Sequence, residues 1–195
     1  MSDLLVAAPM RLEAALIGSA AGGALVRKTG MGPRRARAAA EGLGLQAARA
    51  MLVLGFCGGL DDSSVPGEVI VAESVVAAPQ QDGPAEPVVC GLAVPLLTRL
   101  TGLGMKVRMG RLVCVSRLAL GEHREELRAG GAIAVDMESV WLAAGARGRP
   151  FGVVRVVLDS PAHELLRPQA IGGALRAALA LRRVAGALHD FSPED

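Results

Sequence analysis

Two apolar strands that each end on acidic residues constrain this chain more than any other feature of its sequence. Residues 132–135 are apolar and run into Asp136 and Glu138, after which the pattern becomes helical. Residues 151–158 are apolar apart from one arginine, and they run into Asp159. A strand that reaches carboxylates where a helix or loop begins places them at the carboxyl edge of a sheet, where open α/β folds bind ligands. The two acidic strand ends therefore indicate an enzyme.

The rest of the chain alternates between apolar, strand-like runs and segments with helical spacing. The other expected strands cover residues 4–8, 25–28, 50–54, 67–72 and 107–116. The expected helices cover residues 10–17, 33–48, 92–100, 122–128, 139–147 and 171–188. This alternation predicts an α/β sheet with helices on both faces. The chain has 195 residues and no linker or internal repeat, so we expect one domain over residues 1–195.

The composition argues against nucleic acid and membrane spans as partners. The formal net charge is only +2, and aromatic residues make up 2% of the chain, so stacking platforms for single-stranded nucleic acid are nearly absent. Hydrophobic residues make up 51%, yet no apolar run approaches the roughly 18 residues that a membrane span needs. We expect a small-molecule substrate, no nucleic acid and no membrane span.

The cysteines and histidines indicate neither a disulfide framework nor a metal site. Cys57, Cys90 and Cys114 are far apart and odd in number, which favours a reducing, cytoplasmic location. The apolar residues 4–8 lack a preceding basic segment, so they are interpreted as a first strand and not as a signal peptide. The three cysteines and three histidines have no metal-ligand spacing, and we expect no metal.

Two glycine-rich stretches predict a close approach of the backbone to a ligand. Residues 29–32 (TGMG) precede a helix that begins near Pro33, where proline at the first helical position is favourable. Residues 55–60 (GFCGGL) follow an apolar strand. Glycine lets a ligand come close to the backbone, and the N-terminus of a helix favours an anion.

Taken together and in order, these motifs resemble those of the nucleoside phosphorylase and nucleosidase superfamily, which cleaves N-glycosidic bonds. The matching pieces are residues 8–13 (APMRLE), 29–32 (TGMG), 55–60 (GFCGGL) with 66–69 (PGEV), and 135–139 (VDMES) with 155–159 (RVVLD). The resemblance implies a three-layer fold with a twisted, mixed central sheet flanked by helices. It also implies a homo-oligomer in which a neighbouring subunit helps to close the site.

Within the superfamily the chain is most similar to two groups. One is the 5'-methylthioadenosine/S-adenosylhomocysteine nucleosidases. The other is the hopanoid-associated phosphorylases, which release adenine from adenosylhopane. Three features favour the second group: the short length, the sequence AVDMES at residues 134–139 and the sequence RVVLDSPA at residues 155–162.

The resemblance implies a role for five residues. Met137 and Glu138 would hold the ribose, with the Glu138 carboxylate accepting hydrogen bonds from its hydroxyls. Asp159 would protonate purine N7 or share a proton with it, and Glu13 would activate the attacking water of a nucleosidase. Gly58 would pass close to the sugar or the nucleophile.

The attacking group remains open between phosphate and water. Arg11 and Gly32 match positions that would bind phosphate, a possible co-substrate, and no resident cofactor is implied. However, Phe56 stands where some phosphorylases place a phosphate-binding serine, and Val53 where they place an arginine. Phe56 would then contact the substrate, and Leu118 would take the place of the phenylalanine that often stacks on the base.

The chemistry agrees with these roles. Adenine leaves poorly as an anion, and a general acid at N7 makes it a neutral leaving group, an effect worth about 10²–10⁴-fold. Burial at the end of an apolar strand favours the protonated form of a carboxyl such as Asp159. The ribose becomes cation-like in the transition state, which an ionised Glu138 would stabilise. An aspartate at position 159 suits a 6-aminopurine.

Simpler interpretations stand beside the functional ones. Glu138 could complement a helix dipole, Asp159 could cap a loop with Ser160, and Glu13 could lie on a solvated face. Asp136 is expected to pair with a basic group such as Arg155.

His163, Cys57 and the overall function also have alternative interpretations. His163 lies in the loop after Asp159, either near the substrate or on the surface, and Cys57 is expected to be a small buried residue and not a nucleophile. We expect cleavage of an adenine nucleoside with a modified 5' group. The alternatives are a catalytically silent nucleoside-binding protein of the same fold and, more remotely, a membrane-surface module.

Overall fold

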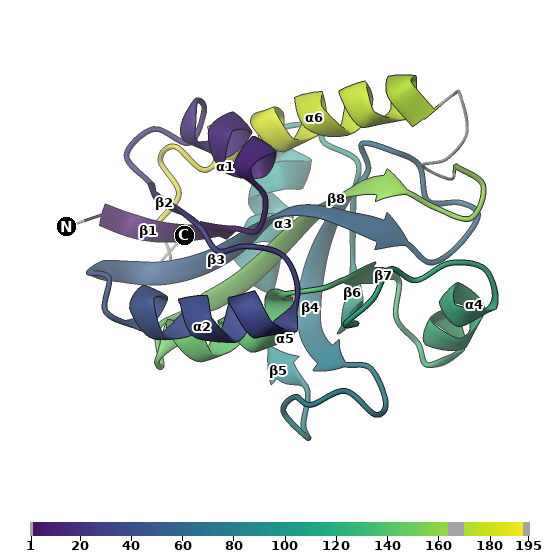
Figure 1. Ribbon diagram of the computed structural model, residues 1–195. Helices are drawn as coiled ribbons and strands as arrows, with labels where there is room; N and C mark the ends of the chain where they lie inside the picture. Colours follow the sequence, from purple (N-terminus) through teal and green to yellow (C-terminus); the bar gives the residue numbers. More distant parts are fainter. Residues whose placement is uncertain (1, 164–169, 193–195) are drawn as a thin grey trace.

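The computed structural model describes residues 2–163 and 170–192, which form one mixed sheet with helices on both sides (Figure 1). The strands are β1 (Ser2–Ala8), β2 (Leu25–Lys28), β3 (Ala48–Gly59), β4 (Val69–Ala77), β5 (Val88–Val89), β6 (Val107–Cys114), β7 (Ala134–Asp136) and β8 (Phe151–Asp159). The helices are α1 (Arg11–Gly18), α2 (Pro33–Gly44), α3 (Ala93–Gly102), α4 (Glu122–Ala129), α5 (Ser139–Leu142), the 3-10 helix η1 (Ala143–Ala146) and α6 (Ala170–Ala187). The predicted fold, a mixed central sheet flanked by helices, is confirmed.

The order of the strands brings the two acidic strand ends together. The order is β2-β1-β3-β7-β6-β4-β5, and β8 pairs with both β3 and β4. Strands β3, β8, β4, β6 and β7 therefore close into a ring. Gly58 near the end of β3 stands in register with Val135 of β7 on one side and with Asp159 of β8 on the other.

The helices cover the sheet with their apolar faces. Helices α1 and α6 lie on one side of the sheet, and α2 and α5 lie on the other (Figure 1). Helix α6 turns Ala177, Leu181 and Val184 inward, and all three are buried. This spacing of four and three residues is the pattern of a helix with one core-facing stripe. Within the described residues, no helix has both the length and the apolar composition that crossing a bilayer requires.

Three predicted boundaries differ from the structure by several residues, and one of them is the end of β4, which lies at Ala77 and not at residue 72. Helix α2 ends at Gly44 and not near residue 48, because residues 48–59 form the long strand β3. Strand β3 also continues through the glycine cluster, which the sequence analysis placed after the strand. The pairing of Gly55 with Arg155 and of Phe56 with Val156 shows that the glycines belong to the ladder. A register shift falls only between Cys57 and Gly58.

Candidate active site

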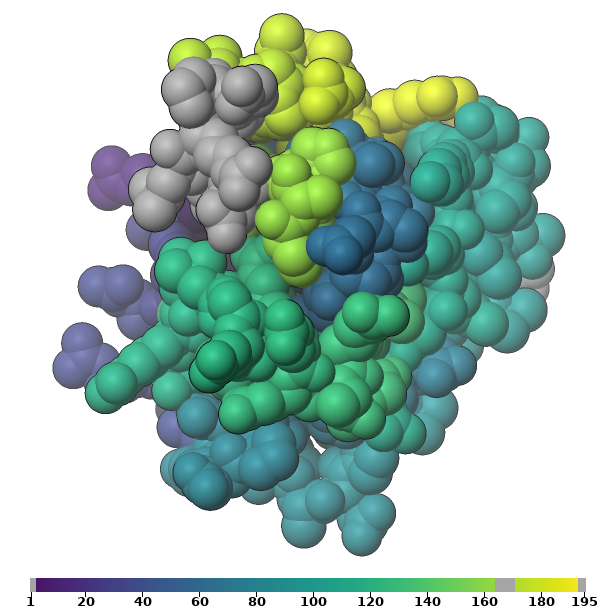
Figure 2. Space-filling view, turned by 90° about the vertical axis from the view of Figure 1, so that its right-hand side faces the viewer, coloured from purple at the N-terminus to yellow at the C-terminus, as the bar shows by residue number. Residues whose placement is uncertain are grey.

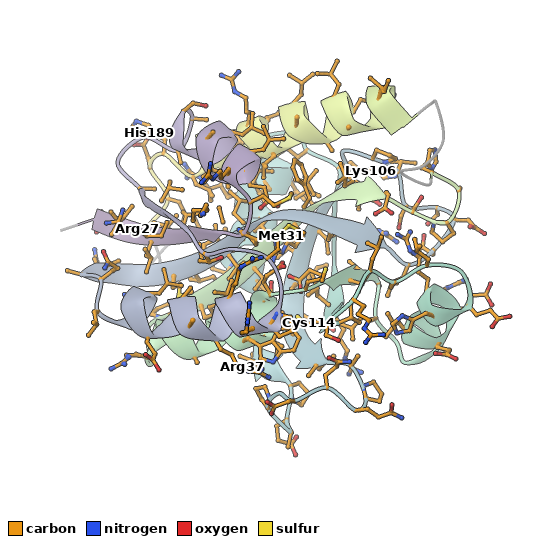
Figure 3. All side chains as sticks on the ribbon, viewed as in Figure 1. Arg27, Met31, Arg37, Lys106, Cys114 and His189 are labelled. Carbon is orange, nitrogen blue, oxygen red and sulfur yellow. The ribbon has the colours of Figure 1, made fainter. Side chains whose placement is uncertain are left out.

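A cleft of about 270 Å³ lies where β3, β7 and β8 meet the start of α1 and the loop between β2 and α2. Met31 on that loop, labelled in Figure 3, forms part of its wall. The lining residues are Pro9, Met10, Glu13, Met31, Phe56, Cys57, Gly58, Leu118, Val135, Asp136, Met137, Glu138, Leu158 and Asp159. The structure thus places both strand-end acids, Glu138 and Asp159, on the walls of one cleft.

Arg155, which is fully buried, connects the side chains of Asp136 and Ser139 next to the cleft. The Arg155 guanidinium, 0% exposed, donates from Nη2 to Asp136 Oδ2 at 2.5 Å and to Ser139 Oγ at 3.0 Å. The same nitrogen lies 3.6 Å from Glu138 Oε2. The predicted pairing of Asp136 with Arg155 is confirmed. Three nearby carboxylates, those of Asp136, Glu138 and Glu13, raise the pKa of Arg155 against the effect of its burial.

Asp136 has a structural role that sets the position of Glu138. Its Oδ1 accepts hydrogen bonds from the backbone N–H groups of Glu138 at 3.2 Å and Ser139 at 3.3 Å, and its Oδ2 accepts one from Ser139 Oγ at 2.5 Å. These bonds satisfy N–H groups at the start of α5 that have no partner within the helix. Asp136 therefore caps the helix, and the Glu138 side chain is left to face the cleft.

Glu138 is held by the glycine loop on the opposite side of the cleft. Its Oε1 accepts a hydrogen bond from the Gly32 backbone N–H at 2.8 Å, although 106 residues separate the two. Gly32 has φ of 84°, a conformation that favours glycine. Burial, and secondly the charge of Asp136, raises the pKa of Glu138 to about 7. Glu138 therefore changes its charge near neutral pH.

We expect the stability of the empty protein to report this ionisation. The folded-state pKa of about 7 lies above the ordinary value of 4.5, so Glu138 contributes stability below pH 4.5 and loses it as the pH rises through 7. Glu138→Gln should therefore unfold at higher urea than the unmodified protein at about pH 8, and at nearly the same urea at about pH 5. The exposed Glu41→Gln is the matched control. An equal difference at both pH values would contradict this expectation.

Glu13 is buried on the wall of the cleft, which excludes the alternative that it lies on a solvated face. Only 1% of its surface is exposed. Its Oε1 accepts a hydrogen bond from the Phe56 N–H at 2.7 Å, and its Oε2 accepts one from the Met10 N–H at 2.6 Å. Burial raises the pKa of Glu13, and the nearby Arg155 partly opposes that effect. A carboxylate with a raised pKa is a stronger base, which suits the activation of water.

The packing of Glu13 explains why residue 55 is glycine. A Cβ at Gly55 would overlap Glu13 Oε1 and would lie 2.7 Å from Arg155 Nη1. Because both groups are buried and hydrogen-bonded, we expect Gly55→Ala to destabilise the fold by about 1–3 kcal/mol. Gly42→Ala in α2 is the control, since a Cβ there meets nothing within 4 Å. That change should be neutral or stabilise by up to about 1 kcal/mol.

Urea unfolding measures both variants. The explanation for Gly55 fails if Gly55→Ala unfolds at the same urea concentration as Gly42→Ala.

Asp159 meets a second buried arginine, which sequence reasoning did not anticipate. Arg124 Nη2 on α4 lies 2.5 Å from Asp159 Oδ2, and 3% of Arg124 is exposed. The expected surroundings of Asp159 were the apolar residues of its own strand. The ion pair adds a positive charge to that setting. The hydroxyl and the backbone of the neighbouring Ser160 contact His163.

Comparison with models of protein families identifies the family of this chain. A model of the phosphorylase superfamily matches residues 6–185. The chain belongs to the phosphorylase superfamily. This confirms the predicted superfamily and, with it, the prediction of an enzyme. No match was found among curated proteins.

Solved structures share the fold of this phosphorylase-superfamily protein over nearly its whole length. Futalosine hydrolase of Helicobacter pylori is 16% identical, with a TM-score of 0.79 and coverage of 96% of this chain and 97% of that one. An S-adenosylhomocysteine nucleosidase from Streptococcus pyogenes is 18% identical, with a TM-score of 0.77 and coverage of 95% and 96%. A 5'-methylthioadenosine/S-adenosylhomocysteine nucleosidase from Neisseria meningitidis is 18% identical, with a TM-score of 0.75 and coverage of 98% and 100%.

The predicted site residues of this superfamily member fall into two groups. Glu13, Phe56, Gly58, Leu118, Met137, Glu138 and Asp159 line the cleft. Arg11 and Gly32 do not: Arg11 is exposed on α1, and Gly32 reaches the cleft only through its hydrogen bond to Glu138. His163 is exposed and contacts Ser160, outside the cleft.

Several lining residues of the superfamily site were missed. Met10, Met31 and Leu158 carry no chemical signal of their own, since an apolar wall looks like an apolar core in sequence. Cys57 lies on the wall as well, and burial raises the pKa of its thiol well above the ordinary range. Within residues 2–163 and 170–192, no group of three histidine, cysteine or acidic side chains is arranged to hold a metal ion.

Proposed function

We propose that the protein cleaves the N-glycosidic bond of an adenine nucleoside with a modified 5' group and releases adenine. The observation that carries this proposal is the placement of Glu138 and Asp159 on the walls of one cleft, with Glu13 buried beside them. Superfamily membership and the nucleosidase and hydrolase names of the solved neighbours support the same reaction.

Each acid has a distinct part in the proposed mechanism. Glu138, in its ionised form, accepts hydrogen bonds from the ribose hydroxyls beside Met137 and stabilises the cation-like ribose of the transition state. Asp159 delivers a proton to N7, so that adenine leaves neutral when the bond to the sugar breaks. Glu13 takes a proton from the water that attacks the sugar. Gly58 lines the cleft next to Asp159, and a side chain there would crowd Val135, Arg124 and Asp159.

The charges around the cleft favour water over phosphate as the attacking group. Among the residues that the structure describes, no lysine or arginine lines the cleft, whereas four acids do. A phosphate dianion would have to enter beside Glu13, Asp136, Glu138 and Asp159. The two buried guanidinium groups nearby, those of Arg155 and Arg124, are already engaged by Asp136 and Asp159. Arg11, the phosphate ligand implied by the resemblance, is exposed on α1 and outside the lining. We therefore propose hydrolysis, with phosphorolysis as the competing outcome.

The apolar wall favours an apolar 5' group. Met10, Met31, Leu118 and Leu158 line the cleft, and 48% of Met31 and 59% of Leu118 are exposed. Exposed methionine and leucine at a cleft gain free energy when an apolar group covers them, at about 25 cal/mol per Å². A methylthio group or the longer hydrocarbon of adenosylhopane would cover them, so both nucleosides are proposed as substrates.

A direct test compares substrates with and without phosphate. The purified protein is incubated with methylthioadenosine, adenosylhopane and adenosine, and adenine and the sugar product are separated by chromatography. We expect faster release from nucleosides with an apolar 5' group than from adenosine, at a rate that phosphate does not change. A phosphorylated sugar product would establish phosphorolysis. Binding of adenine without cleavage of any nucleoside would indicate a silent binding protein and would overturn the proposal.

A further inference from the structure

Arg124 is a buried charged residue on a helix whose other charged side chains are exposed. Along α4 only Arg124 and Leu127 are buried. Taking a guanidinium out of water costs several kcal/mol unless charge and hydrogen bonds compensate for it. The structure supplies both, which indicates that the position of this side chain matters.

The guanidinium joins three segments around the cleft. Its Nε donates to the Ala119 carbonyl at 2.8 Å, and its Nη1 donates to the Gly59 carbonyl at 3.3 Å. Its Nη2 donates to Asp159 Oδ2 at 2.5 Å. Figure 2 shows α4, the loop that follows β3 and the end of β8 side by side on one face of the molecule. Arg124 thereby connects Asp159 to the loop that carries Leu118.

Several other ionisable groups among the described residues share the cleft with Asp159 or lie close to it. Glu138 from the turn after β7 and Glu13 from α1 share the cleft with it. Cys57 from β3 is close enough for its thiol to sense the charge of Asp159, and that thiol is neutral because burial raises its pKa. In the loop that follows, His163 contacts Ser160. Two buried guanidinium groups lie in this region: Arg155 contacts Asp136 and Glu138, and Arg124 on α4 contacts Asp159 itself.

We propose that Arg124 is a positioning residue that holds Asp159 as a carboxylate in the empty site, so that nucleoside binding brings the uptake of one proton onto Asp159. This inference rests on the proposed function, because it gives Asp159 the role of acid at N7. A carboxylate paired with a guanidinium carries no proton to donate. The pair must therefore loosen when the purine enters, and solvent must supply the proton.

The proton balance of the cycle closes without another reactant. Asp159 takes a proton from solvent and passes it to N7 while the sugar–N9 bond breaks and its electron pair stays on the purine. Water adds its oxygen to the sugar carbon and loses a proton to Glu13, which returns it to solvent. Neutral adenine leaves, and the Asp159 carboxylate pairs again with Arg124. The net reaction consumes one nucleoside and one water.

The first test is the pH profile of kcat/KM for methylthioadenosine. An opposite charge this close lowers the pKa of a carboxyl group by roughly 1–3. Because Arg124→Gln removes that charge, Asp159 should keep its proton to higher pH. The alkaline half-maximum of kcat/KM should therefore move upward by about the same amount. Arg124→Lys, which keeps the charge, should stay close to the unmodified protein. Arg128→Gln, an exposed arginine on the same helix, is the control and should change nothing. A uniform loss of rate by Arg124→Gln at every pH would mean a merely structural role and would overturn the inference.

The second test needs no turnover. Calorimetric titration with adenine, in buffers of different ionisation enthalpy, gives the number of protons taken up on binding. We expect about one proton for the unmodified protein above neutral pH, fewer for Arg124→Gln and none for Asp159→Asn. No uptake by the unmodified protein, or equal uptake by Arg124→Gln, would refute the inference. Uptake that depends on Arg124, without cleavage of any nucleoside, would leave the inference standing while the proposed function fails.

Discussion

Replacing Asp159 with asparagine is expected to slow adenine release by about 10²–10⁴-fold, the range that a positioned general acid contributes. An amide keeps the shape of the carboxyl and still accepts a hydrogen bond from Arg124, but it cannot hand a proton to N7. The measurement is kcat with methylthioadenosine under saturating conditions. We expect kcat to fall far more than KM changes, because the proton transfer belongs to the transition state.

The matched control for this prediction is Asp190→Asn. Asp190 has a side chain that is 82% exposed and lies next to His189, so the same chemical change there should leave kcat unaltered. Because Asp159→Asn also removes the charge opposite a buried arginine, its unfolding midpoint is measured first and the assay is run well below it. Activity within threefold of the unmodified protein would remove Asp159 from the mechanism.

Replacing Arg155 with methionine is expected to lower the free energy of unfolding by about 3–5 kcal/mol. Methionine fills much of the same volume, but it leaves the buried Asp136 and Glu138 carboxylates without their counter-charge. The loss should be larger above pH 7 than below it, because Glu138, with a pKa of about 7, becomes neutral at low pH and no longer needs the guanidinium. Urea unfolding at several pH values measures both effects.

Two variants separate charge from packing in this prediction. Arg182→Met replaces an exposed arginine on α6 and should cost little. Arg155→Met combined with Asp136→Asn should recover part of the loss if the unpaired carboxylate causes it, since contacting residues do not contribute additively. A loss below about 1 kcal/mol for Arg155→Met would show that the buried pair contributes little to the fold.

Local sequence patterns predicted those strands and helices whose formation depends mainly on the residues within them. The apolar runs before Asp136 and Asp159 correspond to β7 and β8, and the expected helices at residues 10–17 and 122–128 match α1 and α4 within about two residues. The glycine cluster was harder, because its residues lie within a strand. Gly55 is required by the side chains of Glu13 and Arg155 that press against it, and no pattern around residue 55 reveals them.

The candidate site also has features that the sequence predicts and features that only the tertiary structure shows. The sequence alone determined the superfamily, the acids at the ends of two apolar strands and the pairing of Asp136 with Arg155. Apolar strand runs and the order of motifs depend only on the order of residues in the chain. Only the tertiary structure decided that Glu13 is buried, that Arg11 lies outside the cleft and that Arg124 reaches Asp159 across 35 residues. Burial and charge pairing depend on which segments meet in space, and they set the ionisation on which the proposed chemistry rests.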